Sequence, residues 1–387
     1  MISKKKIAIT FPQLHKFGGG EIFCEYTANL LSRFYKIDLY FYKINKINQR
    51  LKIKKNIKLI PIKSKNKIID YFCSNYIGIA QLYLMFFLNS KKLNYKFLFS
   101  AAGEFYSNFY KVYQYIHHPF YSLNPNHYAA LGVKKKNIKR IILRFFLSVF
   151  ARIYFKLYNK RSNHMQHRIS VVNSNWTKAR FKSIYNERAY LIYPTFLIPK
   201  YLKGFQKSYE KRKNDFVILG RVSEDKNTIL GANFFIELKN KISKIGNLHI
   251  IGPCDDSLKR KINASLYKFK KKVFFHGYLS IKERNKILKQ CKFGLHFAKF
   301  EHFGRAVLEM HKHGIIVFVH NSGGSKEIIV DEFQKYSSMK ELHNNIIKLV
   351  NSKNRRYKII KKYDQKFLRN FTDSKFREDF KNIFFKR

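Results

Sequence analysis

Two carboxylates late in the chain have a spacing that could do chemistry. Glu301 and Glu309 flank seven residues in the segment 301–309 (EHFGRAVLE). The first follows a strand-like run and the second lies one to two turns into an expected helix, so both could face one crevice. A carboxylate accepts two hydrogen bonds side by side, which suits the neighbouring hydroxyls of a hexose or a ribose. The amides after Gly304 begin this helix and could meet a phosphate.

A loop with two cations forms the second candidate group. Residues 220–227 (GRVSEDKN) follow another strand-like run, and Arg221 and Lys226 lie five residues apart within them. Two such charges suit a diphosphate, and the chain contains no Asp-x-Asp motif that would chelate a divalent ion on it. We therefore expect these cations, with backbone amides, to neutralise a leaving diphosphate without a metal. The alternative is an ordinary solvated basic loop.

A run of three glycines near the start is the third candidate. Residues 18–20 separate a strand-like run, 6–11, from helical spacing over 21–33. At the carboxyl edge of a sheet, Gly19 and Gly20 would let the backbone approach a phosphate or sugar. A tight turn explains the glycines equally well.

Strand-like and helix-like stretches alternate through much of the chain, which predicts parallel sheets covered on both faces. A polar, basic stretch at 195–214 indicates an interdomain connection. We predict an α/β protein with two Rossmann-like domains, residues 1–198 and 199–365. A helical tail, 366–387, is expected to pack back on the first domain. The expected strands are 6–11, 37–42, 57–62, 97–102, 112–117, 169–173, 191–193, 216–220, 248–252, 273–277, 293–298 and 315–320.

Composition restricts the class of protein. The 387 residues include 78 Lys and Arg against 24 Asp and Glu, a formal charge of +54, so an anionic partner is expected. A biased genome can produce part of this charge, because Lys, Ile, Asn, Phe and Tyr are abundant together. The 45% hydrophobic content excludes a disordered basic tail. Four widely spaced cysteines and no export signal favour a reducing cytosol, without a disulfide framework or a metal site.

Two segments raise the question of a membrane. Residues 71–90 carry no charge over about the length of a bilayer span, but polar residues interrupt them, and we favour a buried or interfacial helix over a span. Residues 140–158 place four cations among Phe, Leu, Ile and Tyr. This composition is typical of a helix that lies on an anionic membrane, and equally of a core helix with a basic outer face.

The 301–309 segment resembles the E-x7-E signature of the family-4 retaining glycosyltransferases of GT-B fold, and 220–227 is similar to their GR-x4-KN donor loop. The residues of the motifs resemble more closely still those of the α-1,2-mannosyltransferases that elongate dolichol-linked oligosaccharide. They show similar EHFG, HNSGG-x-K, Y-x-H-x-P and VNS-x-WT motifs, which are residues 301–304, 320–326, 115–119 and 172–177 of this chain. The resemblance covers about residues 17–330.

The resemblance implies two Rossmann-like domains that face each other across a cleft. It implies that Arg221 and Lys226 hold a donor diphosphate, that Glu301 with Phe303 holds the transferred hexose, and that Glu309 binds the donor ribose. His117 would lie beside the reacting sugar. The residues so assigned to catalysis are His117, Glu301, Arg221 and Lys226, and those assigned to donor binding are Gly19, Gly20, Arg221, Lys226, Gly277, Phe303, Gly304, Arg305 and Glu309.

Three features depart from the family pattern or weaken an assignment. His117 adjoins His118, and a paired His in a loop is often structural. Arg305 stands where a small or apolar residue is usual, and residues 310–313 (MHKH) replace the usual small alanines, so an altered donor pocket is expected.

The function implied by the resemblance is retaining transfer of a hexose, with mannose from GDP-mannose favoured. The acceptor would be a lipid-linked or cell-surface glycan, such as lipopolysaccharide or capsule, at the cytoplasmic face of an anionic membrane to which the protein binds peripherally. Retention implies that the leaving phosphate acts as base, with no carboxylate nucleophile. No cofactor, metal or specific nucleic acid is expected. The alternatives are a GT-B nucleotide-sugar epimerase, which needs no acceptor, and a basic nucleic-acid-binding protein, for which no motif is recognised.

Overall fold

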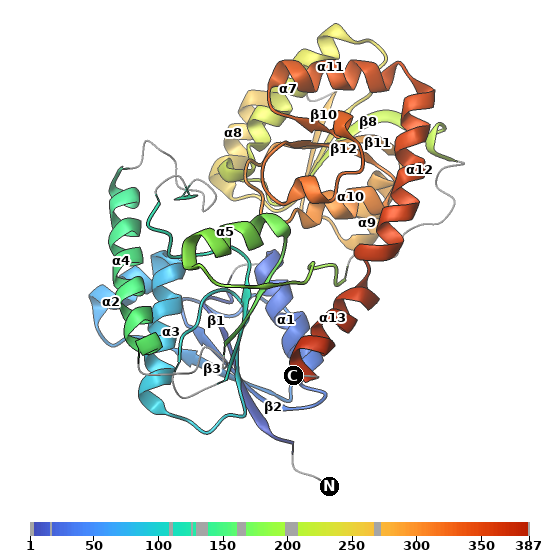
Figure 1. Ribbon diagram of the computed structural model, residues 1–387. Coiled ribbons are helices and arrows are strands. Elements are labelled where there is room, and N and C mark those ends of the chain that lie inside the picture. Colours follow the sequence, from blue (N-terminus) through green and yellow to red (C-terminus); the bar gives the residue numbers. More distant parts are fainter. Residues whose placement is uncertain are drawn as a thin grey trace. The chain divides into compact units, whose positions relative to one another are not determined.

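The computed structural model describes residues 4–15, 18–107, 111–124, 127–128, 138–160, 168–197, 208–266 and 272–385. The chain divides into two compact units (Figure 1). Unit 1 comprises residues 1–194 and 380–387, and unit 2 comprises residues 195–379. The division therefore falls slightly before the expected boundary at 198/199, and half of the expected connection at 195–214, residues 198–207, lies outside the described residues.

Unit 1 is built on a seven-stranded sheet in the order β3-β2-β1-β4-β5-β6-β7. Every neighbouring pair is parallel, as the alternating pattern predicted. Its strands are β1 (Lys6–Phe11), β2 (Lys36–Tyr42), β3 (Ile57–Ile62), β4 (Leu98–Ser100), β5 (Val112–Ile116), β6 (Arg168–Val172) and β7 (Tyr190–Leu191). Its helices are α1 (Gly19–Leu31), α2 (Lys67–Asn75), α3 (Ile77–Lys91), α4 (Ile138–Lys160) and α5 (Asn175–Tyr185).

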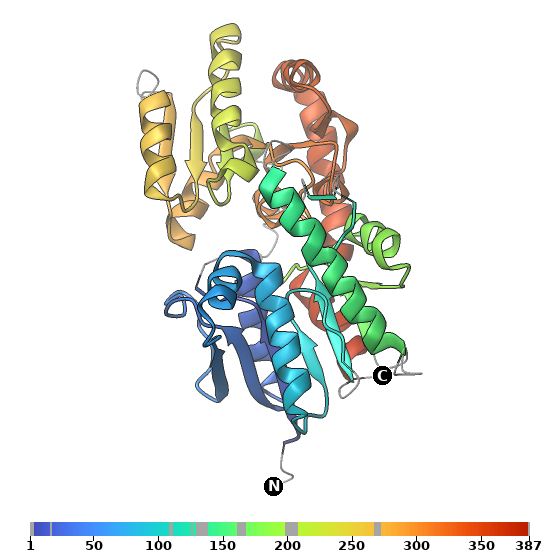
Figure 2. The ribbon, with the colours of Figure 1, turned by 90° about the vertical axis from the view of Figure 1, so that its left-hand side faces the viewer.

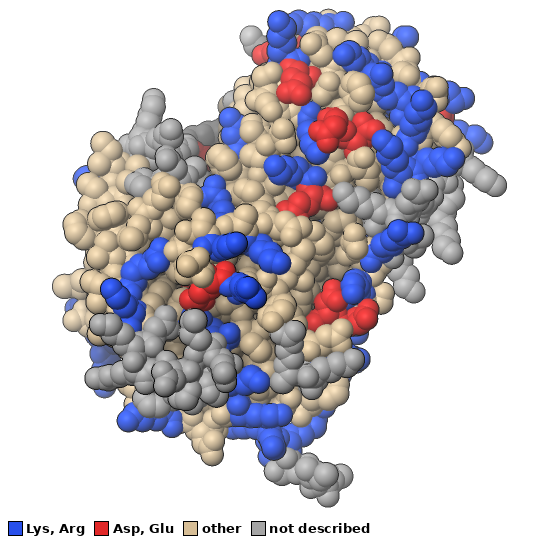
Figure 3. Space-filling model, viewed as in Figure 1, with Lys and Arg blue, Asp and Glu red and all other residues tan. Residues whose placement is uncertain are grey.

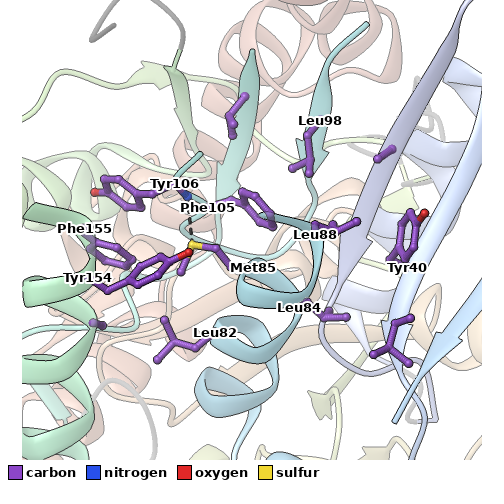
Figure 4. Packing of buried hydrophobic residues seen from close by; sticks show 14 of the residues in the cluster. Tyr40, Leu82, Leu84, Met85, Leu88, Leu98, Phe105, Tyr106, Tyr154 and Phe155 are labelled. Carbon is purple, nitrogen blue, oxygen red and sulfur yellow. Dashed lines mark hydrogen bonds between the residues drawn. The ribbon is translucent and has the colours of Figure 1, made fainter. Parts of the chain in front are cut away.

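Alternate residues of β4 and β5 serve two cores, because successive side chains of a strand point to opposite faces. Leu98 and Val112 join a buried cluster with residues of α3 and α4 (Figure 4). On the opposite face, the Phe99 ring contacts Phe23 of α1, and the Phe99 and Tyr113 rings contact Phe384. Both faces of the sheet are thus covered, which explains why these strands are largely apolar.

Unit 2 contains a six-stranded parallel sheet in the order β10-β9-β8-β11-β12-β13. Its strands are β8 (Lys213–Leu219), β9 (Leu248–Ile251), β10 (Val273–Gly277), β11 (Cys291–His296), β12 (Ile316–His320) and β13 (Lys335–Tyr336). Its helices are α7 (Thr228–Lys241), α8 (Asp256–Leu266), α9 (Ile281–Leu288), α10 (Arg305–Lys312), α11 (Met339–Val350) and α12 (Lys353–Asn370).

Two helices, α12 (Lys353–Asn370) and α13 (Asp373–Phe385), end the described chain, so the helical region begins earlier than the expected tail at 366–387. The last helix, α13 (Asp373–Phe385), contains the point at which the chain passes from unit 2 to unit 1. Phe380 and Phe384 stack with ring centroids 4.1 Å apart, and both contact Phe99 of β4. The C-terminal residues are therefore part of the unit 1 core.

The uncharged segment 71–90 is divided between two helices. α2 ends at Asn75 and α3 begins at Ile77, with Tyr76 in extended conformation between them. The Gln81 side chain is buried and donates to the Ser100 hydroxyl and the Glu104 carbonyl, so α3 packs into unit 1. Within the described parts of the chain, no helix combines the length and the apolar character needed to cross a bilayer.

Candidate functional site

The strand order places two motif loops side by side in unit 2. Sequence order reverses between β8 and β11, which are paired neighbours, and ligands of open α/β sheets bind at the carboxyl ends of strands at such a switch point. The loop after β8 contains Arg221 and Lys226, and the loop after β11 contains Glu301. A Cβ on Gly220 would lie only 3.7 Å from the Ala306 Cβ, so the cationic loop also borders the first turn of α10.

Glycines hold three strand-end loops of unit 2 together. A Cβ on Gly252 would lie 1.8 Å from the Gly220 carbonyl oxygen, and both residues have positive φ (+155° and +127°). The Gly252 amide donates to the Gly277 carbonyl at 2.7 Å, and the Gly220 amide donates to the Ile251 carbonyl at 3.0 Å. A Cβ on Gly277 would meet open space, so the room beside this predicted donor-binding residue is free of protein atoms.

Asn227 explains how Lys226 is positioned. Residues Glu224–Lys226 form one 3-10 turn, and Asn227 follows with φ +51°. The Asn227 amide side chain donates to the Phe297 carbonyl at 3.1 Å, which ties the loop to the end of β11. The Lys226 ammonium lies 2.5 Å from a Glu301 carboxylate oxygen. The structure thus brings together two residues that the sequence predicted for one site.

Glu301 is a largely buried carboxylate, 15% exposed, beside two basic groups. The His296 Nε2 atom lies 3.3 Å from the carboxylate oxygen that Lys226 contacts. Burial alone would raise the pKa of Glu301, but Lys226, His296 and His302 outweigh it and hold this pKa well below its usual range. The carboxylate is therefore ionised near neutral pH and accepts hydrogen bonds without donating any.

The HNSGG loop supports the backbone of Glu301. The Gly324 amide donates to the Glu301 carbonyl at 2.6 Å, and the Ser322 hydroxyl accepts from the Phe300 amide at 3.0 Å. Gly323 has φ +80°, and a Cβ there would lie 2.4 Å from the Glu301 carbonyl oxygen. Only glycine fits this position, which explains why the HNSGG motif has a glycine there.

Glu309 lies on α10, which begins after Gly304 (φ +97°). Its carboxylate forms an ion pair with Arg284 of α9 at 2.7 Å. Burial raises the pKa of Glu309, and Arg284 and Arg305 oppose that shift. The Arg305 guanidinium also stacks over the Phe196 ring at 4.1 Å, so the residue that departs from the family pattern packs at the start of α10.

Two other predicted residues of unit 2 differ in exposure. Arg221 is exposed and pairs with Asp225 at 3.4 Å, rather than with either glutamate of the E-x7-E segment. Phe303 is buried, and its ring lies 6.2 Å from the Phe371 ring. Phe303 therefore packs inside unit 2 beside Gly304, whereas the Arg221 side chain extends toward solvent.

Unit 1 holds the remaining predicted residues at its own switch point, between β1 and β4. Gly19 begins α1 after β1, and a Cβ on Gly20 would make only an ordinary contact, 3.4 Å, with the Phe11 ring. The His117 Nε2 atom lies 3.1 Å from the carbonyl of Ala101, which follows β4. The His117 ring also packs edge-on against the Phe23 ring at 5.0 Å.

The VNS-x-WT motif positions His117 and begins α5. The Asn173 side chain donates to the His117 carbonyl at 3.0 Å, and the Ser174 hydroxyl accepts from the Thr177 amide at 3.0 Å as a helix cap. His118 is buried and stacks on Trp176 with centroids 5.8 Å apart. His118 is thus the structural member of the pair, and His117 the one that borders the switch point.

Sequence reasoning missed two residues that contact predicted ones, His296 and Arg284. His296 offered a signal, because a polar residue at the carboxyl end of a buried strand points to the ligand edge of the sheet. Arg284 offered none, because α9 is an ordinary amphipathic helix by sequence. Among the described residues, no group of three or more His, Cys, Asp or Glu side chains is arranged to hold a metal ion.

Comparison with known proteins adds family information. Residues 203–366 match the family model described as "Glycosyl transferases group 1". A curated relative from Mus musculus, "GDP-Man:Man(3)GlcNAc(2)-PP-Dol alpha-1,2-mannosyltransferase", is 31% identical over 180 residues, which is 42% of this chain and 36% of the relative. The enzyme of the same description from Xenopus tropicalis is 27% identical, over 44% of this chain and 37% of the relative. The match thus spans little more than a third of these proteins.

Solved structures resemble the whole chain. Sucrose-phosphate synthase from Thermosynechococcus elongatus has a TM-score of 0.70 at 13% identity, over 99% of both chains. Anabaena HepE in complex with UDP and glucose has a TM-score of 0.66 at 14% identity, over 99% of this chain and 100% of its own. WaaG, described as a glycosyltransferase involved in lipopolysaccharide biosynthesis, has a TM-score of 0.64 at 13% identity, over 98% and 100%. At these identities the likeness defines the fold alone.

Proposed function

From the premise that residues 203–366 belong to the group 1 glycosyl transferases and that the chain has the GT-B fold, we propose that this protein transfers a hexose from a nucleotide sugar. The observation that carries the proposal is the pair formed by Lys226 and Glu301 at the switch point of unit 2. It combines a cation for a phosphate with an ionised acceptor for sugar hydroxyls, and these are the two ends of a sugar diphosphate.

The proposed roles follow from the charge and burial of each group. Lys226 and Arg221 bind the diphosphate, and the amides at the start of α10 add donors to it. Glu301 accepts from the hexose hydroxyls, while His296 and Lys226 keep it ionised. Glu309, largely buried beside Arg284, accepts from the hydroxyls of the ribose.

The proposed reaction retains configuration and needs no carboxylate nucleophile. The acceptor hydroxyl oxygen bonds to the anomeric carbon on the face from which the diphosphate departs. The bond between that carbon and the phosphate oxygen breaks, the electron pair leaves with the diphosphate, and the hydroxyl proton passes to a phosphate oxygen. Arg221 and Lys226 stabilise the departing charge, so the proposal assigns no step to a metal ion. His117 is proposed to border the reacting sugar.

The donor and acceptor are proposed at a finer level. Matches to proteins described as GDP-mannose-dependent mannosyltransferases acting on dolichol diphosphate oligosaccharide support GDP-mannose and a lipid-linked glycan. The EHFG and HNSGG segments support the same type of mannosyltransferase, because both segments form the surroundings of Glu301 described above. The acceptor of this chain is then a glycan attached to a lipid diphosphate, or a growing surface glycan.

The test is transfer of labelled sugar into an extractable lipid fraction. We expect label from GDP-mannose, in preference to UDP-glucose or UDP-galactose, to enter lipids extracted from the source membranes. Lys226→Ala should lower the rate at least about 100-fold, while Lys244→Ala, an exposed lysine of unit 2, should leave it unchanged. Interconversion of free nucleotide sugars without an acceptor, or equal rates in parent and Lys226→Ala, would contradict the proposal.

A further inference from the structure

The outer face of α4 is exposed and apolar. Seven large apolar side chains on it are between 41% and 66% exposed, with spacings of three and four residues that keep them on one side of the helix. They are Ile138, Ile142, Phe145, Phe146, Phe150, Ile153 and Leu157, called the α4 face below. From its first to its last residue this stripe extends about 28 Å, at about 1.5 Å per residue.

The opposite side of α4 already forms the core contact of unit 1. Ala151, Tyr154 and Phe155 are buried, and the Phe155 ring stacks on Tyr106 at 3.8 Å (Figure 4). An apolar face of a helix is normally covered, whether by protein or by lipid. Here the protein covers one side of α4 only. An exposed apolar surface about 28 Å long marks an interaction site.

The apolar surface continues from α4 onto α3, which packs beside it (Figure 2). Phe86 of α3 is partly exposed, and its ring lies 6.0 Å from Phe150 and 4.3 Å from Tyr154. In the space-filling view, uncharged surface over α4 is bordered by Lys and Arg (Figure 3). The surface is thus a patch over two helices rather than a single stripe.

Charge indicates what covers this patch. Residues 138–157 contain five cations and no carboxylate: Lys139, Arg140, Arg144, Arg152 and Lys156. Lys139, Arg140 and Lys156 are exposed, at the two ends of the α4 face, where long side chains can reach charged groups beside a buried apolar surface. The occupant must therefore be apolar along the middle of the helix and anionic around it.

We propose that the α4 face docks unit 1 onto the surface of a bilayer rich in anionic phospholipid, with α4 lying in the plane of the interface. Phe, Ile and Leu side chains would enter the acyl boundary while the cations contact lipid phosphates. A second copy of the chain is a poorer occupant, because it would bring another +54 charge against the first. The inference goes beyond the proposed function, since docking requires neither donor nor turnover.

The test is flotation of the full chain with lipid vesicles, without any nucleotide sugar. We expect the parent to float with vesicles of phosphatidylcholine plus phosphatidylglycerol, and to remain largely unbound with phosphatidylcholine alone. The triple variant Phe146→Ser, Ile153→Ser and Leu157→Ser should bind the anionic vesicles at least about tenfold more weakly. The control variant Ile281→Ser with Tyr357→Ser removes similarly exposed apolar groups from unit 2 and should float like the parent.

Each remaining outcome overturns the proposal. Equal binding of parent and triple variant would place the lipid contact elsewhere, and absence of parent binding to anionic vesicles at low salt would exclude this occupant. A parent dimer that the triple variant dissociates would make the α4 face a contact between copies.

Lys226→Ala should float normally even if transfer is lost, so failure of docking and failure of the proposed catalytic site are distinguishable. Unchanged circular dichroism of the triple variant establishes that it is folded.

Discussion

At the scale of single residues, the site depends on how Glu301 is kept charged while buried. One cation from the loop after β8 and one imidazole from the end of β11 lie within 3.3 Å of the same carboxylate oxygen. An unpaired buried carboxylate would take up a proton instead. The arrangement therefore prepares an acceptor that is charged before any ligand arrives.

Glu301→Gln tests this electrostatic arrangement. Because the pKa of Glu301 is depressed in the folded protein, its contribution to stability is present above the ordinary value of 4.5 and is lost as pH falls through the folded value. Near neutral pH the variant should be less stable by about 2 kcal/mol. That difference should shrink as the pH falls below 4.5. Urea unfolding across this range measures it, with the exposed Glu332→Gln as control.

A pH-independent difference between the parent and Glu301→Gln would show that ionisation of Glu301 does not contribute to stability. A difference that grows toward acid pH would reverse the sign of the argument and place the pKa of Glu301 above its ordinary value.

Arg284 extends the account to a residue that no sequence pattern indicated. Arg284→Gln removes the cation that pairs with the largely buried Glu309, so the proposed ribose contact should weaken in the ground state and the transition state alike. We expect the donor KM to rise roughly tenfold with kcat little changed. Lys282→Gln, on the same helix and exposed, is the matched control for steady-state kinetics. A loss confined to kcat would assign Arg284 a different role.

At the scale of elements, glycines in strand-end loops fix where the side chains of the site point. Gly323 and Gly277 both have positive φ, but a Cβ on Gly323 would collide with the Glu301 backbone, whereas one on Gly277 meets open space. Alanine substitutions at the two positions therefore separate the cost of backbone strain from the cost of a steric clash.

Gly323→Ala should destabilise the protein by about 3 kcal/mol, because strain of about 1 to 2 kcal/mol at positive φ is joined by displacement of the Glu301 loop. Gly277→Ala should cost only the strain, about 1 kcal/mol. Unfolding midpoints in guanidinium measure both. Equal losses in the two variants would mean that the loop at 300–304 yields freely to a larger side chain.

Elements were predictable where a local pattern determines them. The apolar runs predicted parallel strands, and the Ser-x-x-Glu spacing of Ser280 and Glu283 is the local pattern of the capping box that begins α9. The break at Tyr76 was harder to place, because helical periodicity continues on both sides of it. The structure shows α2 capped at its start by Asn66 and ended before Tyr76, with α3 turned into the core of unit 1.

At the scale of the whole molecule, each unit is an open parallel sheet with its own switch point, and the motifs gather there. The family resemblance implied that Lys226 and Glu301 share a site, yet their ion pair depends on β8 pairing with β11, which lies far along the chain. Arg284 meets Glu309 through the packing of α9 near α10, which no local pattern encodes. Sequence therefore predicted which residues matter better than it predicted which atoms meet.

The most direct measurement of the central claim, that fixed cations of unit 2 hold a sugar-nucleotide diphosphate, is calorimetric titration of the chain with GDP. The account predicts saturable binding to the parent and to Lys244→Ala, and affinity at least about tenfold lower for Lys226→Ala, since each factor of ten corresponds to about 1.4 kcal/mol. Equal GDP affinity in all three proteins, or no binding of GDP by the parent, would contradict it.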